Sequence, residues 1–205
     1  EDMAAHGLDD DAIDGDEVVF PDGYDRLPAH LAEGLDIRLE HVVSRVRWSA
    51  DGVVVTADRG ELRADTVVVT VPVGVLQSDD FSIEPALPEP VAGALSRLAM
   101  NAFEKVFLRF PRKFWDDGVY AIRQQGLEGR RWHSWYDLTA LHGEPTLLTF
   151  AAGPTAVEIR SWSEAEVVDS VLAQLARLYG DRVERPTSVS ITDWQGDPFA
   201  HGSYA

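Results

Sequence analysis

Cysteine is absent from the 205-residue sequence, and its absence removes several kinds of chemistry at once. Disulfide bonds, thiolate nucleophiles and cysteine-ligated metal sites all need this residue. The six histidines form no H-E-x-x-H motif and no other closely spaced pair of ligands. The sequence therefore predicts no metal site.

Long apolar runs are also absent. No stretch reaches the length of a membrane span, and the first residues lack the basic segment and apolar segment that mark a secretory signal peptide. We expect a soluble protein, most simply cytoplasmic, without membrane association.

Positive charge is scarce. The sequence has 18 Lys and Arg against 35 Asp and Glu, which gives a net charge of −17. This negative net charge argues against binding to nucleic acid or to an anionic membrane. A negatively charged protein attracts cationic ligands more readily than anionic ones. Residues 1–15 carry acidic side chains but no Lys or Arg, which predicts a solvated acidic tail or linker.

Three motifs of common enzymes are missing as well. The sequence contains no G-x-S-x-G nucleophile turn, no G-x-x-x-x-G-K-[ST] phosphate loop, and no G-x-G-x-x-G after a strand. The last motif places a helix N-terminus under the pyrophosphate of a dinucleotide. The chain therefore lacks the commonest binding element for such a cofactor.

Apolar residues make up 45% of the sequence, enough for one sizeable domain or two small lobes. The most informative segment is the run from Ala64 to Leu76. Its three consecutive valines predict a strand buried on both faces that ends at Pro72. Ahead of it, the pattern predicts a short helix with Leu27, Leu31 and Leu35 on one stripe, then a β-meander with strands over residues 37–48 and 52–57.

The composition changes after Gln77, where Asp, Ser, Glu and Pro become frequent, and we place a domain boundary there. Ser163 and Glu166 form a capping box at the start of an amphipathic helix that ends before Gly180. The remaining expected elements are a helix that begins at Pro88 and strands over residues 105–110, 131–137, 147–152 and 187–194.

Two places offer chemistry. Lys105 shares a strand face with Phe107, so its amine either projects over an apolar sheet surface into a cavity or reaches solvent. Near the C-terminus, Trp194, Phe199 and Tyr204 are separated by Gly and Pro. These rings either line a pocket for a flat ring or a cation, or fill the core.

Together these segments resemble the flavin-containing amine oxidases, a family that includes polyamine oxidases, monoamine oxidases and flavin-dependent histone demethylases. The resemblance covers residues 16–205 and depends on the order of the segments more than on any one of them. They are Asp22-Gly23-Tyr24 with Leu27 and Leu31, Ile37-Arg38-Leu39 with Val43 and Val46, residues 64–76, Phe81 with Glu84-Pro85 and Leu87-Pro88, Lys105-Val106 with Phe114-Trp115, and Trp194 with Asp197-Pro198 and Gly202-Ser203-Tyr204.

The resemblance implies a mixed α+β and α/β fold in three parts. Residues 16–77 would form part of an FAD-binding domain, residues 78–193 a substrate domain whose mixed sheet is backed by helices, and residues 194–205 a return to the FAD-binding domain. The implied cofactor is FAD, with Val43 at its adenine end and Thr70, Val71 and Pro72 close to it.

The implied reaction oxidises a small amine. The neutral amine loses hydride to the flavin, the imine is hydrolysed, and oxygen takes the electrons to give peroxide. By the resemblance, Lys105 binds a water beside flavin N5, Trp194 packs near the flavin ring, and Tyr204 lines the amine site.

The chain also departs from the family. The N-terminal G-x-G-x-x-G segment and a C-terminal Gly-Glu segment are missing, and Asn101 and Asp22 stand where the family has glycine. We therefore expect an internal fragment, or one chain of a split enzyme, that needs the remainder of the flavin domain in cis or as another chain. Alone it would bind FAD weakly or not at all.

Two other functions stay open. An L-amino-acid oxidase, or another flavoprotein of the same superfamily, would need an arginine for the substrate carboxylate, for which Arg109, Arg123 and Arg160 are candidates. A catalytically inactive binding or scaffold module would keep the fold without needing Lys105.

Overall fold

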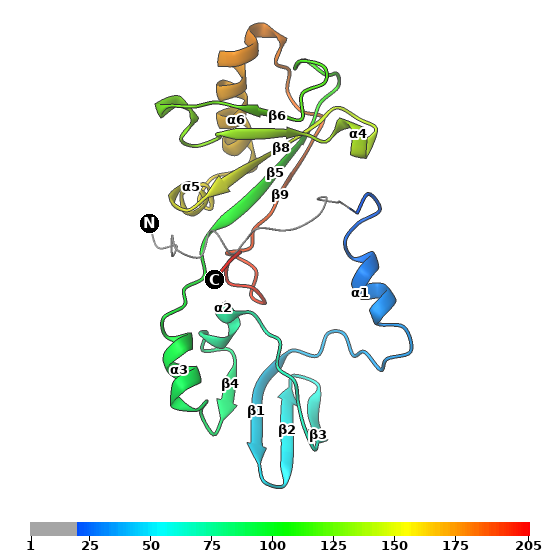
Figure 1. Cartoon of the computed structure of the whole chain (residues 1–205), viewed down its shortest axis with the longest axis vertical. Coiled ribbons are helices and arrows are strands. Elements are labelled where there is room, and N and C mark those ends of the chain that lie inside the picture. The colour runs from blue at the N-terminus through cyan, green and yellow to red at the C-terminus, as the bar shows by residue number, and fades with distance from the viewer. Residues whose placement is uncertain (1–19) are drawn as a thin grey trace, which may run out of the picture. The chain divides into compact units, whose positions relative to one another are not determined.

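The computed structural model describes residues 20–205, so the acidic segment 1–15 lies outside the described residues. The chain divides after Ile37 into two units. In the first, helix α1 (Arg26–Leu31) forms where the leucine spacing predicts it (Figure 1). The leucines of its stripe are exposed, with Leu31 at 67% and Leu35 at 65%, so the stripe is not part of a core among residues 20–37.

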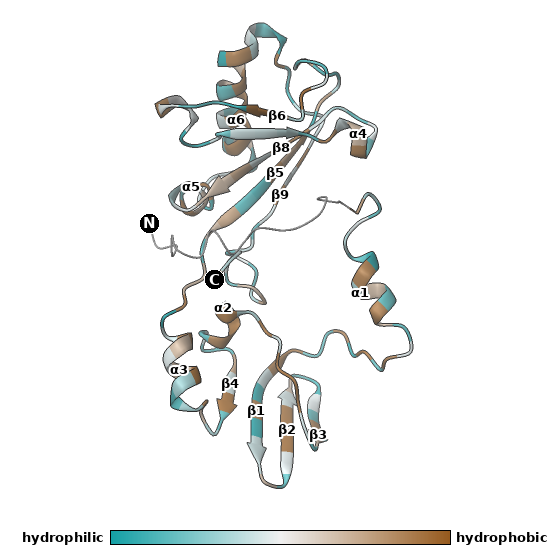
Figure 2. Cartoon of the chain, in the orientation of Figure 1, coloured by the Kyte–Doolittle hydropathy of each residue, from teal (hydrophilic) through white to brown (hydrophobic). Residues whose placement is uncertain are grey.

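The second unit contains a small four-stranded sheet in the order β3-β2-β1-β4 (Figure 1). Strands β1 and β2 form the expected antiparallel pair, although β1 begins at Val43 and not at residue 37. Strand β3, which was not predicted, extends the meander, and β4 pairs parallel to β1. Val46, Val53 and Phe81 form its small core, and β2 is largely brown in Figure 2 because it is rich in valine. The bounds are β1 Val43–Ser49, β2 Gly52–Ala57, β3 Gly60–Ala64 and β4 Ser82–Glu84.

The prediction of a buried strand in the run from Ala64 to Leu76 is wrong. Beyond Ala64 the chain is irregular up to Pro72 and then forms the single turn of α2 (Val73–Leu76). Val67, Val68 and Val69 are 40%, 86% and 37% exposed. The valines favour an extended backbone, but a strand also needs neighbours to pair with, and within residues 20–205 no strand pairs with this segment.

A second, five-stranded sheet has the order β6-β7-β8-β5-β9, and its described pairings are all antiparallel. The expected strands within residues 105–110, 131–137, 147–152 and 187–194 are present, with shifted ends, whereas β6 was not anticipated. The bounds are β5 Phe103–Arg109, β6 Ala121–Arg123, β7 Ser134–Asp137, β8 Thr146–Ala152 and β9 Ser188–Ile191.

Helix α6 (Glu164–Tyr179) confirms the most local of the predictions. Ser163 caps it, and the reciprocal bonds of the capping box with Glu166 are both formed. The other described helices of this unit are short. Besides α2, they are α3 (Glu89–Leu95), α4 (Thr139–His142) and α5 (Pro154–Ile159), with single 3₁₀ turns η2 (Leu127–Gly129) and η3 (Gly180–Arg182).

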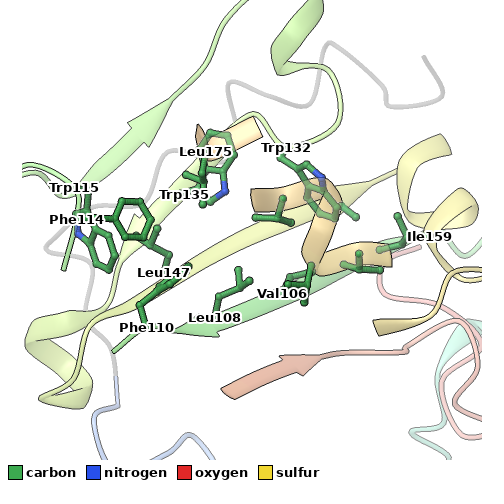
Figure 3. Packing of buried hydrophobic residues seen from close by; sticks show 14 of the residues in the cluster. Val106, Leu108, Phe110, Phe114, Trp115, Trp132, Trp135, Leu147, Ile159 and Leu175 are labelled. Atoms are coloured by element: carbon green, nitrogen blue, oxygen red, sulfur yellow. The ribbon is translucent and has the colours of Figure 1, made fainter. Parts of the chain in front are cut away.

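The main core lies between one face of the large sheet and helices α5 and α6 (Figure 3). Val106 and Leu108 of β5 are fully buried there, together with Trp132, Trp135 and Leu175. Burying a residue of this size stabilises a fold by roughly 1.5–3 kcal/mol. Because successive strand residues point to opposite faces, the same packing turns Lys105 to the other face of the sheet.

Candidate active site

Lys105 lies in the middle of β5, on the face away from the core. Its neighbours Glu104 and Val106 are buried, whereas Lys105 and Phe107 are half-buried on the opposite face. The backbone is held on both sides, because Lys105 pairs with Phe150 of β8, and its N–H donates to Thr192 Oγ1 over 2.8 Å. The expected side-chain parity is thus confirmed. Lys105 is also one of only two lysines among the chain's 18 basic residues.

A continuous row of aromatic rings crosses this face of the sheet. Tyr120 contacts Tyr136 with ring centroids 5.4 Å apart, and Tyr136 contacts Phe150 at 5.6 Å. Phe150 contacts Phe103 at 5.2 Å, and Phe103 contacts Tyr204 at 5.6 Å. Such a surface offers π-faces to a flat group or to a cation. Alternation alone places Phe103 beside the lysine, but the other rings are brought there by strand register and by the C-terminal segment.

The C-terminal segment is tied to the start of β5. Asn101 and Tyr204 form an isolated bridge in which the Asn101 N–H donates to the Tyr204 carbonyl over 2.6 Å. The Phe103 N–H donates to Ser203 Oγ over 3.2 Å, and the Ser203 hydroxyl donates back to the Phe103 carbonyl. Lys105 and Tyr204 therefore share one face of the sheet.

Glu104 organises the turn that leads into this segment, a role that the sequence did not reveal. Its side chain is 3% exposed and accepts hydrogen bonds from Thr192 Oγ1 at 2.6 Å and from the Trp194 N–H at 3.1 Å. The backbone and the side-chain amide of Gln195 donate to its other oxygen over 3.3 and 3.5 Å. The signal was an acidic residue at an inward strand position, but its partners lie some 90 residues away.

The aromatic residues of the C-terminal segment do not fill the core. Trp194, Phe199 and Tyr204 are 44%, 60% and 61% exposed. The segment itself is closely packed: a Cβ added to Gly74 of α2 would lie 2.4 Å from the Ala200 carbonyl oxygen. The exposed fractions contradict the alternative in which these rings fill the core, and of the three only Phe199 lines a cavity described below.

A cavity of about 1010 Å³ lies beside the small sheet. Val43, Val71 and Pro72 line it together with Pro198 and Phe199, so three of the expected cofactor residues come together with the C-terminal segment. Thr70, which immediately precedes Val71, is exposed and does not line the cavity, and neither do Trp194 and Tyr204. The rest of the lining is Glu40, His41, Val42, Asp58, Arg59, Val75, Asp80 and Phe81.

The three arginines considered for a substrate carboxylate lie in different places. Arg109 is on the same face of β5 as Lys105, and its guanidinium forms an ion pair of 2.8 Å with Glu144. Arg123 is exposed at the end of β6. Arg160 lines a separate cavity of about 250 Å³ next to Glu104, on the core side of β5. Of the three, only Arg109 is on the strand that carries Lys105.

The carboxylate of Asp137 also accepts several hydrogen bonds, and it lies outside this site. Burial raises the pKa of Asp137, but hydrogen bonds from Thr139, the Trp115 indole and Lys113 lower it by more, so that the pKa is about 2. The Trp115 Nε1–Oδ2 distance is 2.8 Å and the Lys113 Nζ–Oδ2 distance is 3.1 Å. In return, the hydrogen bond to Asp137 raises the pKa of Lys113.

Residues 20–205 contain no helix long and apolar enough to cross a bilayer, and no group of three His, Asp or Glu side chains placed to hold a metal ion.

The described residues thus combine a small meander sheet, a larger antiparallel sheet and an aromatic face that carries one lysine. The model of the flavin containing amine oxidoreductases matches residues 3–205, so the chain belongs to that family.

The relatives in this family include demethylases and oxidases. The sequence is 32% identical over 198 residues to lysine-specific histone demethylase 1 homolog 1 of Oryza sativa subsp. japonica, covering 93% of this chain and 23% of the relative. It is 32% identical over 194 residues to polyamine oxidase 4 of the same organism, covering 94% of this chain and 39% of the relative. The solved structure of wild-type putrescine oxidase bound to putrescine matches 89% of this chain and 41% of that chain, with a TM-score of 0.73 and 25% identity. The chain thus spans less than half the length of these relatives.

Proposed function

We propose that the chain is the substrate-binding part, with a portion of the cofactor-binding part, of an FAD-dependent amine oxidase. The observation that carries the proposal is the position of Lys105 and Tyr204 on one half-buried aromatic sheet face. Family membership supports the flavin and the amine as a class. Among relatives, the names polyamine oxidase and histone demethylase favour an aliphatic amine or a methylated lysine side chain as substrate.

The domain limits follow the same scheme. We propose that residues 16–77 belong to the FAD-binding part, residues 78–193 to the substrate part, and residues 194–205 to the return. Strand β4 comes after Gln77 but still pairs with β1 of the small sheet. The chain would therefore pass from the FAD-binding part to the substrate part through β4. The remainder of the flavin domain would be supplied in cis or by another chain.

The large cavity fits part of a dinucleotide. Its volume is at the upper end of the range for ligand pockets, and its lining joins an apolar wall to a few polar groups. Val43, Val71 and Pro72 would hold FAD there, with Thr70 next to Val71 along the chain and with Trp194 and Tyr204 of the C-terminal segment nearer the reacting end. When bound, FAD supplies the acceptor for hydride from the amine α-carbon and passes the electrons to oxygen.

The chain's own residues would prepare the amine. Aromatic faces attract the cationic ammonium form, and partial burial among Phe103, Phe150 and Tyr204 then favours loss of its proton. The Lys105 amine would hold a water by hydrogen bonding and present it for hydrolysis of the imine carbon. Tyr204 would orient the substrate chain. Lys105 forms no covalent bond in this scheme.

Replacement of Lys105 by methionine tests the proposal. In the complete protein, K105M should lower kcat for amine oxidation about tenfold to a hundredfold, because the water loses its hydrogen-bond partner while the side-chain volume is kept. Peroxide formation with polyamines, monoamines and L-amino acids measures the rate and the substrate class. Lys113→Met, which removes the only other lysine, should leave the rate unchanged.

Three outcomes would count against the assignment. Equal, measurable rates for wild type and K105M would refute the role of Lys105, and no peroxide with any amine would favour an inactive binding module. Activity confined to L-amino acids would favour the amino-acid oxidase instead, for which Arg109, on the same face as Lys105, would be the carboxylate partner.

A further inference from the structure

A second cavity, of about 450 Å³, has the opposite electrostatic character to the chain as a whole. The chain has a net charge of −17, yet three of its 18 basic residues converge on this one hollow. The lining residues are Leu127, Arg130, Arg131, Thr155, Ser170, Ala173, Gln174 and Arg177.

One stripe of α6 forms the floor of the cavity. Ser170, Ala173, Gln174 and Arg177 stand at positions i, i+3, i+4 and i+7, which lie on one side of a helix. This stripe is distinct from the apolar one, which includes Leu175 and packs on the sheet. The cavity therefore belongs to the helix side of the sheet, and Lys105 projects from the other side.

The loop that supplies Arg130 and Arg131 is held in place by buried contacts. Gln174 is 7% exposed, and its amide donates to Gln124 Oε1 over 2.8 Å and to the Trp132 carbonyl. A Cβ added to Gly129 would lie 2.0 Å from the Gln124 carbonyl oxygen, so this loop closes tightly only with glycine. The guanidinium groups thus start from a fixed backbone.

Two of the lining side chains are already oriented. Arg131 binds both oxygens of Glu158 through Nη2, at 2.7 and 2.8 Å, and stacks on Trp162 with its Cζ 4.8 Å from the ring centroid. The Nη1 and Nε atoms of Arg131 do not take part in the ion pair with Glu158. Ser170 Oγ accepts from the Trp132 indole over 3.0 Å, so its own proton is available to a ligand. Glu158 offsets the charge of Arg131, and the charge that favours an anion comes from the cluster as a whole.

We propose that this cavity binds an oxyanion of the phosphate class, with room for a diphosphate group. Guanidinium forks and hydroxyl donors match phosphate oxygens in geometry and charge, and several such hydrogen bonds act together. The inference does not depend on the proposed oxidase activity, since none of the lining residues takes part in it.

Calorimetry of the purified protein with sodium pyrophosphate at constant ionic strength tests this site. Saturable binding is expected, and Arg130→Ala should weaken it about tenfold, the loss of one charged hydrogen bond. Arg185→Ala is the matched control: it removes the same charge from the same unit, but Arg185 pairs with Asp169 at 2.7 Å and does not line the cavity. Binding by this variant should stay within about twofold of wild type.

Further arms separate the outcomes. Titration with O-phosphoserine in place of pyrophosphate shows whether the natural ligand resembles a phosphorylated protein side chain or a free diphosphate. Saturable binding of either compound supports the site, and the tighter one indicates the source of the phosphate group. Heat that does not saturate, or an equal loss in both arginine variants, overturns it, because unspecific attraction would then explain the binding. Amine oxidation by Arg130→Ala should equal that of wild type, so failure here is distinct from failure of the proposed function.

Discussion

Two neighbouring side chains, Lys105 and Glu104, differ in how far their positions could be predicted from the sequence. Lys105 could be assigned to the outer face of its strand because alternation is a local property. Glu104, the preceding residue, could not be interpreted from the sequence. Its four donors come from residues 192–195, and a carboxylate at a buried strand position has no pattern of its own.

Replacement of Glu104 by glutamine should destabilise the fold. The amide keeps one acceptor but turns an NH₂ group toward N–H or O–H donors, which leaves buried groups unpaired. The expected loss in the free energy of unfolding is about 2 kcal/mol, measured by urea denaturation. Glu144→Gln, whose partner Arg109 is partly exposed, should cost less than about 1 kcal/mol. Similar small losses in both variants would show that the Glu104 hydrogen bonds matter little.

Among the elements, those defined by local contacts were the predictable ones. The capping box of α6 is complete within residues 163–166, and the hairpin from β1 to β2 needs only a short turn at Gly52. The run of valines after Ala64 failed because a strand is defined by its neighbours. The aromatic row was missed for a related reason, since Tyr136 and Phe150 meet only through the register of β7 and β8.

The contacts of Asp137 link β7, α4 and the loop at Lys113, and they should make stability depend on pH. The pKa in the folded state is about 2, against 3.8 for the unfolded chain, so the contribution is complete above about pH 4 and is lost as the pH falls toward 2. Its size at neutral pH is on the order of 2 kcal/mol.

Urea denaturation of wild type and Asp137→Asn at several pH values measures this effect. The difference between them should be largest at pH 7 and shrink below pH 4. Asp117→Asn removes the other, fully exposed partner of Lys113 and should show no comparable pH-dependent difference. A gap between wild type and Asp137→Asn that is constant with pH would contradict the assignment.

At the scale of the molecule, sheet and helix packing places the two functional surfaces on opposite sides of one sheet. The face with Lys105 and Tyr204 serves the proposed amine chemistry, and the cavity on α6 serves the proposed anion. The order of sequence segments was enough to predict the family and the fold class. The positions of the rings and arginines depended on packing between segments far apart in the chain.

The 205-residue chain alone should retain FAD weakly. Its sequence has no Gly-rich turn for the diphosphate, and the large cavity includes three carboxylates, Glu40, Asp58 and Asp80. Flavin absorbance after gel filtration with excess FAD measures retention. A yellow protein with one FAD per chain would be the contrary result, and it would also refute the expectation that further flavin-domain residues are needed.

The exposed segment after β3 has a consequence for handling the protein. Residues 66–71 are six uncharged residues, four of them valine and two threonine, with no proline among them. Segments of this kind template intermolecular β-pairing and aggregation when their backbone is accessible. Asp65 and Pro72 flank the segment. A charged residue and a proline are the types that interrupt such pairing, so these two residues should limit aggregation through this segment.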